Sequence, residues 1–394
     1  MASTKPGAAP DTVADDSDVL VRVANVVKYF PVKAGGFVRH TVGQVHAVDD
    51  VSLVIERGKT LGLVGETGSG KSTLARCVAG LIPVTRGSVT FDGTDITKLS
   101  RGAMRPLRRE VQMIFQDPYS SLNPRRRVGS IIGDPFAIHK TATGAERKRR
   151  VQELMERVGL NPEHYNRFPA EFSGGQRQRI GVARALALRP KLIICDEPVS
   201  ALDVSIQAQV LNLLSDLQQE YGLSYLFIAH DLEVVRHVSD KVAVMYLGRI
   251  GEAAPAVDLY GRPRHPYTVA LLSAAPAADP DTAAARQRVI LTGDVPSPID
   301  PPSGCRFHPR CPKAQEICSK VEPALVPDDS RPQPDDDAGQ RAAAASQPAD
   351  AVPGGRAHVT ACHFPVVPGE ILASAAAAGA EAAATAATAK GEPA

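Results

Sequence analysis

The stretch VGETGSGKST, Val64–Thr73, decides the fold of this chain. It matches the pattern G-x-x-x-x-G-K-[ST], and its glycines let the backbone curl until successive N–H groups point at phosphate oxygens. The apolar run TLGLV precedes it. The following STLARCVAGL has the composition of a helix, whose N-terminal dipole also favours anions. The stretch therefore predicts a phosphate-binding loop between a strand and a helix.

We expect the whole loop to bind ATP, through Gly65, Glu66, Thr67, Gly68, Ser69, Gly70, Lys71, Ser72 and Thr73. Lys71 is expected to contact the β- and γ-phosphates, and Ser72 to bind Mg²⁺. The alternative is a chance match in a glycine-rich turn, which ordinary residue usage produces in roughly one or two such chains per hundred. A nucleotide site is therefore the preferred interpretation.

Two acidic residues follow a second apolar strand. In KLIICDEP, Lys191–Pro198, the run ends at Asp196 and Glu197. A carboxylate at a strand end can bind Mg²⁺ through water, which we assign to Asp196, and its neighbour Glu197 can polarise the attacking water. Alone, the pair could equally cap a helix. The phosphate loop upstream favours the catalytic interpretation.

Composition excludes several classes of protein. The 394 residues are 43% hydrophobic and 22% charged, and a net charge of +2 does not indicate a nucleic-acid binder. No apolar run approaches the roughly 18 residues that span a bilayer. The start, MASTKPGAAPDTVADDSD, lacks the apolar core of a signal peptide, and six cysteines in so long a chain do not indicate a secreted disulfide scaffold. We therefore expect a cytoplasmic protein.

Strand-like and helix-like segments alternate along the first 255 residues. Amphipathic patterns predict helices at 213–222 and 232–240. Residues 101–159 are expected to be mainly helical, with a break at DPYSSLNPRRR. Alternating strands and helices predict a parallel α/β sheet. The predicted strands are 19–30, 46–55, 60–65, 87–93, 223–230 and 241–248.

The segment FSGGQRQR, Phe172–Arg179, lies between the phosphate loop and the acidic strand end. SGGQ is the signature of ATP-binding cassette (ABC) ATPases, and the chain resembles that family. It departs from the commonest form in having Phe172 where leucine is usual, a mild change that conserves size. Hydroxyl and N–H groups at a helix start suit an anion. The resemblance implies contact with the γ-phosphate of ATP bound by a second subunit, through Ser173, Gly174, Gly175 and Gln176.

Three further residues match motifs of the family. Gln116 in VQMIFQDP is at the Q-loop position, which senses Mg²⁺ and the attacking water, and His230 in FIAHD is the switch histidine. Asp203 ends the D-loop, SALD, and is expected to contact ATP. The resemblance thus implies catalytic roles for Glu197, His230 and Gln116. The Mg²⁺ ligands that it implies are Ser72, Gln116 and Asp196.

The adenine ring needs an aromatic partner, and the chain contains no Trp. In VVKYFPV, Phe30 best matches the residue that stacks on adenine in this family, and Tyr29 is the alternative. Both could instead belong to the core.

The ABC resemblance covers residues 20 to about 255. It implies a RecA-like P-loop core of the α/β class, an antiparallel β subdomain, and a helical subdomain inserted at about 117–172. We expect a small cysteine-containing domain after the cassette. The full division is a disordered N-terminus (1–18), the ABC ATPase domain (19–255), a C-terminal domain (256–325), a flexible insert (326–357), the end of that domain (358–368) and a low-complexity, alanine-rich tail (369–394).

A second resemblance concerns what the cassette drives. FQDPYSSLNPR, RHPYTVALLSAAP (264–276) and GCRFHPRCPKAQEIC (304–318) follow the pattern of oligopeptide and dipeptide importer ATPases. It implies a peripheral subunit on the cytoplasmic face of the cell membrane that powers peptide import. The implied partners are a second ABC ATPase subunit, identical or paralogous, two transmembrane permease subunits and, indirectly, an extracytoplasmic substrate-binding protein. HPYT itself, His265–Thr268, is expected to be a helix start with Pro266 in its first turn and not a catalytic segment.

Other functions remain open. Nickel and glutathione importers share these segments. A non-transport ABC ATPase acting on nucleic acid or the ribosome could use the basic runs PRRRVG and ERKRR, but such runs are more typical of solvated helix faces. Translation-type ABC proteins also usually carry two cassettes in one chain. No nucleic-acid partner is therefore expected.

Four of the six cysteines lie near the C-terminus, at Cys305, Cys311, Cys318 and Cys362. Four thiolates could bind zinc or an iron–sulfur cluster, although zinc sites more often use C-x2–4-C spacing. Some members of the resembling importer family hold a [4Fe–4S] cluster with cysteines like these. The cluster is therefore the preferred interpretation, with zinc and unligated thiols as alternatives.

Overall fold

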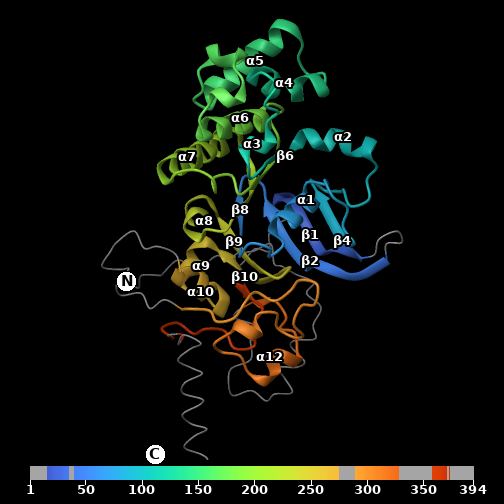
Figure 1. Ribbon diagram of the computed structural model, residues 1–394, viewed down its shortest axis with the longest axis vertical. Helices are drawn as coiled ribbons and strands as arrows, with labels where there is room; N and C mark the ends of the chain where they lie inside the picture. The colour runs from blue at the N-terminus through green and yellow to red at the C-terminus, as the bar shows by residue number, and fades with distance from the viewer. Residues whose placement is uncertain (1–15, 35–39, 275–288, 328–356, 371, 373–394) are drawn as a thin grey trace, which may run out of the picture.

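The computed structural model describes residues 16–34, 40–274, 289–327, 357–370 and 372. The predictions for the extreme N-terminus, for most of the insert (328–356) and for nearly all of the alanine-rich tail fall outside the described residues. An eight-stranded sheet and a four-stranded sheet form the body of the molecule. Helices α4, α5 and α6 lie beyond one end of this body, and the C-terminal region lies beyond the other (Figure 1).

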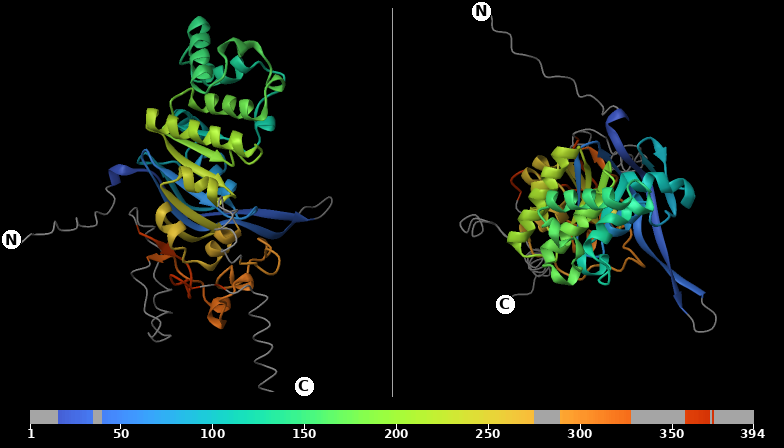
Figure 2. Two further views of the ribbon diagram at one scale, coloured as in Figure 1. Left: turned by 90° about the vertical axis from the view of Figure 1, so that its left-hand side faces the viewer. Right: turned by 90° about the horizontal axis from the view of Figure 1, so that it is seen from above.

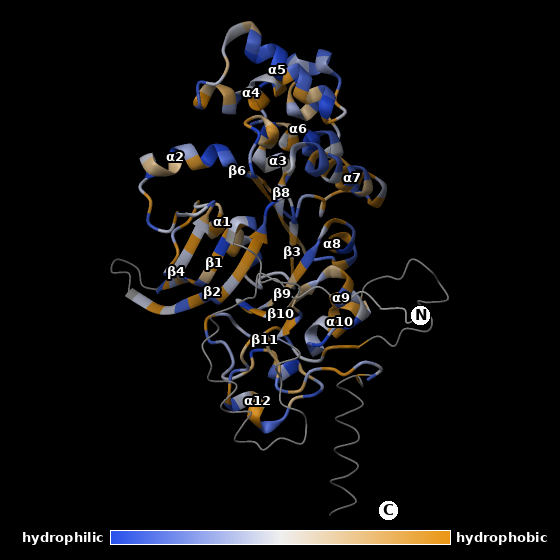
Figure 3. Cartoon of the chain, turned by 180° about the vertical axis from the view of Figure 1, so that it is seen from behind, coloured by the Kyte–Doolittle hydropathy of each residue, from blue (hydrophilic) through white to orange (hydrophobic). Residues whose placement is uncertain are grey.

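The large sheet is built mainly from buried apolar strands. Its order is β11-β12-β10-β9-β3-β8-β7-β6; β9, β3, β8, β7 and β6 are parallel, and the strands from β10 outward pair antiparallel. All residues of β3, β7 and β8 are buried, as expected for parallel strands covered on both faces; the hydrophobic colour of β3 is visible in Figure 3. The strands are β3 (Thr60–Val64), β6 (Val111–Ile114), β7 (Leu192–Asp196), β8 (Ser224–Ala229), β9 (Lys241–Tyr246), β10 (Arg249–Pro255), β11 (Val326–Pro327) and β12 (Val359–Thr360).

The small sheet is antiparallel and has the order β2-β1-β4-β5. Part of β1 and β2 projects from the body as a long ribbon (Figure 2, right). Nearer the body, Val23 and Leu53 are buried in one core cluster with Leu74 of α1, so the sheet covers the helix that follows the phosphate loop. Its strands are β1 (Val19–Ala34), β2 (His40–Glu56), β4 (Arg86–Phe91) and β5 (Thr94–Asp95).

The helices cover the large sheet and build a separate layer beyond it. In that layer α4, α5 and α6 share a core that includes Ile132, Met155 and Ile180, all fully buried. The predicted fold class is confirmed. The helices are α1 (Lys71–Val78), α2 (Arg101–Glu110), α3 (Pro118–Ser121), α4 (Val128–Ile138), α5 (Gly144–Arg157), α6 (Gly174–Leu186), α7 (Val204–Tyr221), α8 (Leu232–Val238), α9 (Ala256–Gly261), α10 (Pro266–Ala274) and α12 (Glu316–Lys320), with short 3-10 turns η1 (Asp16–Asp18), η2 (Pro162–Asn166), η3 (Pro169–Glu171) and η4 (His308–Arg310).

Strands β6 and β10 of the large sheet differ from the sequence expectation. Residues 111–114 lie in the segment expected to be mainly helical, but they form β6, which pairs with β7 from Val111 opposite Leu192. Such a short run is decided by its distant partner and not by its own periodicity. Strand β10 is not predicted from the sequence, because RIGEAAP alternates poorly between apolar and polar residues. In the structure its pairing with β9 is irregular between Ile250 and Glu252.

None of the helices in the described parts of the chain combines the length and the apolar character that crossing a membrane requires.

Candidate functional site

The predicted phosphate loop joins the carboxyl end of β3 to the start of α1. Gly70 has a φ of 106°, and a Cβ there would lie 2.0 Å from the carbonyl oxygen of Ala47 in β2. At Gly65, with a φ of 154°, a Cβ would lie 2.1 Å from the carbonyl oxygen of Met245 in β9. Only glycine fits at these two positions, so β9 of the large sheet and β2 of the small sheet both shape the loop.

Lys71 points back into this loop. Its amine donates hydrogen bonds to the carbonyl oxygens of Gly65 and Glu66, at 2.7 and 2.9 Å, and the residue is buried. Burial lowers the pKa of Lys71, and the negative charges of Glu197, Asp196 and Glu66 partly oppose that shift. The loop therefore holds a cation at its centre, where a phosphate group would need one.

Ser72 and Asp196 face one another across the junction of α1 and β7. The Ser72 hydroxyl donates to the Asp196 carboxylate at 2.7 Å, and Asp196 is almost fully buried. Hydroxyl and carboxylate oxygens are the donors that Mg²⁺ prefers. The pair therefore has the chemistry to hold that ion once ATP phosphates are present.

The three residues predicted to be catalytic come together at the carboxyl ends of β6, β7 and β8. The Gln116 side-chain amide donates to Glu197 Oε2 at 2.7 Å, and His230 Nδ1 lies 3.7 Å from the same oxygen. Glu197 adopts a φ of 46°, which is uncommon for a residue other than glycine, and its N–H donates to the Ile228 carbonyl at 3.0 Å. Strained residues of this kind are often found at active sites.

The signature residues begin α6. Ser173 and Gln176 form a reciprocal cap: the Ser173 hydroxyl accepts from the Gln176 N–H, and the Gln176 side chain accepts from the Ser173 N–H. A Cβ at Gly175 would lie 2.4 Å from Ile206, so this glycine permits close packing against α7. Asp203, the D-loop residue, is the N-cap residue of that same helix. Signature and D-loop are thus packed together.

Phe30 and Tyr29 differ in how they are engaged. Tyr29 stacks on His46, with ring centroids 4.1 Å apart, and its hydroxyl donates to Asp49. Phe30 is 38% exposed, and the Lys28 amine lies over its ring, 4.9 Å from the ring centroid. Phe30 pairs with Val45 of β2, two residues before the Ala47 carbonyl that touches the loop. Phe30 is therefore the more exposed of the two rings, whereas Tyr29 is held by His46 and Asp49.

Sequence patterns missed a contact between the C-terminal region and the phosphate loop. Helix α10 begins at Pro266, as expected, but the next residue, Tyr267, accepts a hydrogen bond from the Glu66 N–H at 2.9 Å. Arg310 binds the Glu66 carboxylate with both terminal nitrogens, at 2.9 and 3.3 Å. No local pattern signals these contacts, because they join residues more than 200 positions apart.

The four C-terminal cysteines line one small cavity, together with His265, His308 and His363. Its volume of about 10 Å³ is close to that of a single water site. Within the described residues, however, no three His, Cys, Asp or Glu side chains form a group that could hold a metal ion. Burial raises the pKa of Cys305, and that of Cys311 to about 12, which favours neutral thiols. The cysteines converge, but they do not form a ready ligand set.

Strand pairing and side-chain contacts fasten the C-terminal segment to the rest of the chain. β12 pairs with β10 and with β11, whose residues Val326–Pro327 open the segment expected to be a flexible insert. His358 binds the fully buried Glu252 at 2.6 Å, and Lys313 pairs with Glu370.

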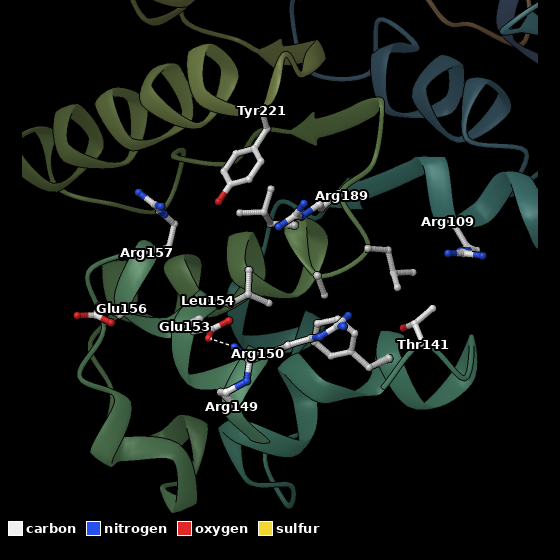
Figure 4. Close-up of a pocket in the computed structure, with 14 residues that line it drawn as sticks. Arg109, Thr141, Arg149, Arg150, Glu153, Leu154, Glu156, Arg157, Arg189 and Tyr221 are labelled. Carbon is white, nitrogen blue, oxygen red and sulfur yellow. Dashed lines mark hydrogen bonds and ion pairs between the residues drawn. The ribbon is translucent and has the colours of Figure 1, made fainter. Parts of the chain in front are cut away.

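A second hollow lies near the amino-terminal ends of β6, β7 and β8, whereas the phosphate loop follows the carboxyl end of β3. It has a volume of about 970 Å³ and opens beside α5, where Arg109, Arg189 and Tyr221 lie two or three residues before β6, β7 and β8 (Figure 4). Several of its charged side chains form ion pairs: Arg149 binds Glu146 and Glu153, and Arg157 binds Glu220. The basic run ERKRR thus belongs to a solvated helix face, and this hollow is separate from the candidate nucleotide site.

The site has the features of an ABC ATPase. These are a phosphate loop, an oxygen pair suited to Mg²⁺, a signature helix, and a carboxylate that the Q-loop glutamine and the switch histidine both approach. The comparisons with known proteins agree. The family model "ABC transporter" matches residues 48–200, and the model "Oligopeptide/dipeptide transporter, C-terminal region" matches residues 252–318.

Two curated relatives match along most of their length. The oligopeptide transport ATP-binding protein AppF of Bacillus subtilis is 53% identical over 311 residues, which cover 79% of this chain and 94% of AppF. The di/tripeptide transport ATP-binding protein DppF of Pseudomonas aeruginosa is 50% identical, over 78% of this chain and 94% of DppF. This chain therefore belongs to the ABC transporter ATP-binding subunits of the oligopeptide/dipeptide family.

Solved cassettes share the fold. A dimeric, post-hydrolysis structure of the ATP-binding cassette MJ0796 bound to ADP and Pi matches with a TM-score of 0.54 and 28% identity, over 60% of this chain and 99% of that one. CbiO1 of Clostridium perfringens, part of the transporter complex CbiONQ, matches with a TM-score of 0.54 and 26% identity, over 62% of this chain and 92% of its own.

Proposed function

We propose that this chain binds and hydrolyses ATP to power the import of peptides through a partner membrane permease. The proposal rests on one observation of the site: Gln116 and His230 both approach the Glu197 carboxylate, beside the phosphate loop. The relatives of the chain are named for peptide transport. Peptides are favoured over nickel or glutathione because AppF and DppF are named for oligopeptide and di/tripeptide transport.

The proposed reaction uses residues from both ends of the cassette. Phosphates enter the loop, where the Lys71 amine exchanges its bonds to backbone carbonyls for bonds to phosphate oxygens. Mg²⁺, held by Ser72, Asp196 and Gln116, would neutralise phosphate charge. Glu197 accepts a proton from the attacking water, and His230 keeps that water and the γ-phosphate in register. Phe30 stacks on the adenine.

The remaining ATP contacts require a second ATPase subunit. Ser173, Gly174, Gly175, Gln176 and Asp203 would complete the site of a partner subunit, and that subunit's signature would complete this one. The dimeric MJ0796 cassette supports this arrangement by analogy. Closure of two subunits over two ATP molecules would move a pair of permease subunits, and hydrolysis would release them. The substrate-binding protein would deliver peptide to the permease.

The C-terminal cavity is a second part of the proposal. Its four cysteines would hold a [4Fe–4S] cluster, with zinc as the alternative. Convergence of the four residues on one cavity supports this, and the cavity would have to widen because its present volume is about 10 Å³. The centre would act structurally, since ATP hydrolysis needs no electrons.

Affinity purification tests the transport assignment. A tagged full-length chain should sediment with membranes and copurify with two permease subunits after mild detergent extraction. Cells that lack the chain should lose uptake of labelled oligopeptides, and the wild-type gene should restore it. Recovery with ribosomes or nucleic acid, and no effect on peptide uptake, would contradict the proposal.

A further inference from the structure

Two side chains of the C-terminal region hold one residue of the phosphate loop. The Tyr267 hydroxyl accepts a hydrogen bond from the main-chain N–H of Glu66, and the Arg310 guanidinium forks onto the Glu66 carboxylate. Glu66 is thus fixed through both its main chain and its side chain. A bidentate guanidinium–carboxylate contact of this kind constrains orientation as well as distance.

Both partners are buried where the C-terminal region packs against Tyr246 of β9. Tyr267 is fully buried, and its ring lies 4.8 Å from that of Tyr246 and 5.3 Å from that of Phe307. Arg310 is 8% exposed, and its terminal nitrogen also lies 3.4 Å from the Tyr246 hydroxyl. A guanidinium group buried to this degree requires a compensating charge, which Glu66 supplies.

Glu66 in turn belongs to the internal network of the loop. Its carbonyl oxygen accepts from the Lys71 amine at 2.9 Å and from the Ser69 N–H at 3.1 Å. Its carboxylate brings a negative charge into a loop that has to accept a polyphosphate, and this charge acts on the Lys71 amine. Without a partner, that carboxylate would repel the incoming phosphates.

We propose that Tyr267 and Arg310 are positioning residues for nucleotide binding. Tyr267 fixes the main-chain path of the phosphate loop at Glu66, and Arg310 neutralises the Glu66 carboxylate so that it does not repel the triphosphate. The C-terminal region therefore contributes to nucleotide binding through these two residues. This inference rests on the proposed role of the phosphate loop in binding ATP.

The dissociation constants of ATP and ADP, measured on the full-length chain, test the charge effect. Arg310→Gln should weaken ATP binding about tenfold and ADP binding less, because the repulsion grows with phosphate charge. The double variant Glu66→Gln/Arg310→Gln should regain most of the lost ATP affinity, since it leaves no unpaired carboxylate. Arg310 acting only to dock the C-terminal region would give no such rescue. Lys320→Gln, in an exposed pair with Glu316, is the matched control and should bind ATP normally.

A second variant separates loop shape from loop charge. Tyr267→Phe keeps the ring packing and removes only the acceptor of the Glu66 N–H. It should weaken ATP and ADP binding by the same factor, about fivefold, and Glu66→Gln should not rescue it. Its folding is checked by the thermal midpoint.

Wild-type affinity in both Arg310→Gln and Tyr267→Phe would overturn this inference alone. So would a loss in Arg310→Gln that Glu66→Gln does not recover. A wild-type chain that binds no ATP would overturn the proposed function and this inference together.

Discussion

At the scale of single residues, the motifs predicted from sequence are brought into contact by the fold. Gln116, Glu197 and His230 come from three loops and meet at one carboxylate oxygen. These three residues could be predicted from the sequence, because each lies in a short local motif. The roles of Tyr267 and Arg310 could not be predicted from the sequence, because they depend on contacts with Glu66 that only the folded chain creates.

Asp49 gives a prediction about stability and pH. It binds the Tyr29 hydroxyl and the guanidinium groups of Arg249 and Arg306. Burial alone would raise the pKa of Asp49, but these partners outweigh it and hold the pKa below its usual value. The stability they contribute is therefore present above about pH 4 and is lost as the pH falls through the lowered value.

Asp49→Asn should accordingly lower the free energy of unfolding by about 3 kcal/mol at pH 7, and by less as the pH falls below 4. Urea denaturation at several pH values measures this. Glu316→Gln, in an exposed pair with Lys320, should change stability by less than about 0.5 kcal/mol. An Asp49→Asn effect that does not depend on pH would show that the carboxylate charge is unimportant.

At the scale of elements, the segments with a strong local signal in their own sequence are predictable. The strand before the phosphate loop and the buried strand that ends at Asp196 are continuous apolar runs, and both are central strands of the sheet. β6 and β12 were not predictable, since they have four and two residues and exist through their pairing with β7 and β10. Long-range pairing leaves no local trace in such short runs.

The cysteine cavity gives a prediction at this scale. Protein purified without oxygen should be brown and carry about four irons per chain, as for a [4Fe–4S] centre with four cysteine ligands. Cys311→Ser should lose the iron, whereas Cys77→Ala, a change at a buried cysteine of α1, should keep it. Colourless protein with one zinc per chain would favour the zinc alternative. Protein with neither metal would leave the cysteines as unligated thiols.

At the scale of the whole molecule, the C-terminal region lies at the other end of the body from α4 and α5 (Figure 1). A tyrosine and an arginine of this region contact the phosphate loop. The phosphate loop precedes α1, whereas the signature begins α6 and packs on α7. The cassette therefore presents these two motifs from separate elements. A partner subunit related by a two-fold axis could then receive one and supply the other.

A crosslink tests this pairing. Ser173→Cys in this chain should form a disulfide with a cysteine placed in the phosphate loop of the partner ATPase subunit, at the position corresponding to the exposed Thr67. ATP should increase the yield in a background that blocks hydrolysis, because the closed dimer is then trapped. With both cysteines in one chain, a crosslink found only within that chain would contradict the head-to-tail arrangement.

The central claim is that Glu197 activates the water that attacks ATP in the motor of a transporter. The most direct test is steady-state ATP hydrolysis by the full-length chain purified with its membrane partners, for wild type and Glu197→Gln. We predict that the variant binds ATP as tightly as wild type and loses at least about 99% of turnover, the scale expected when a general base is removed. Turnover in Glu197→Gln equal to that of wild type would contradict the account.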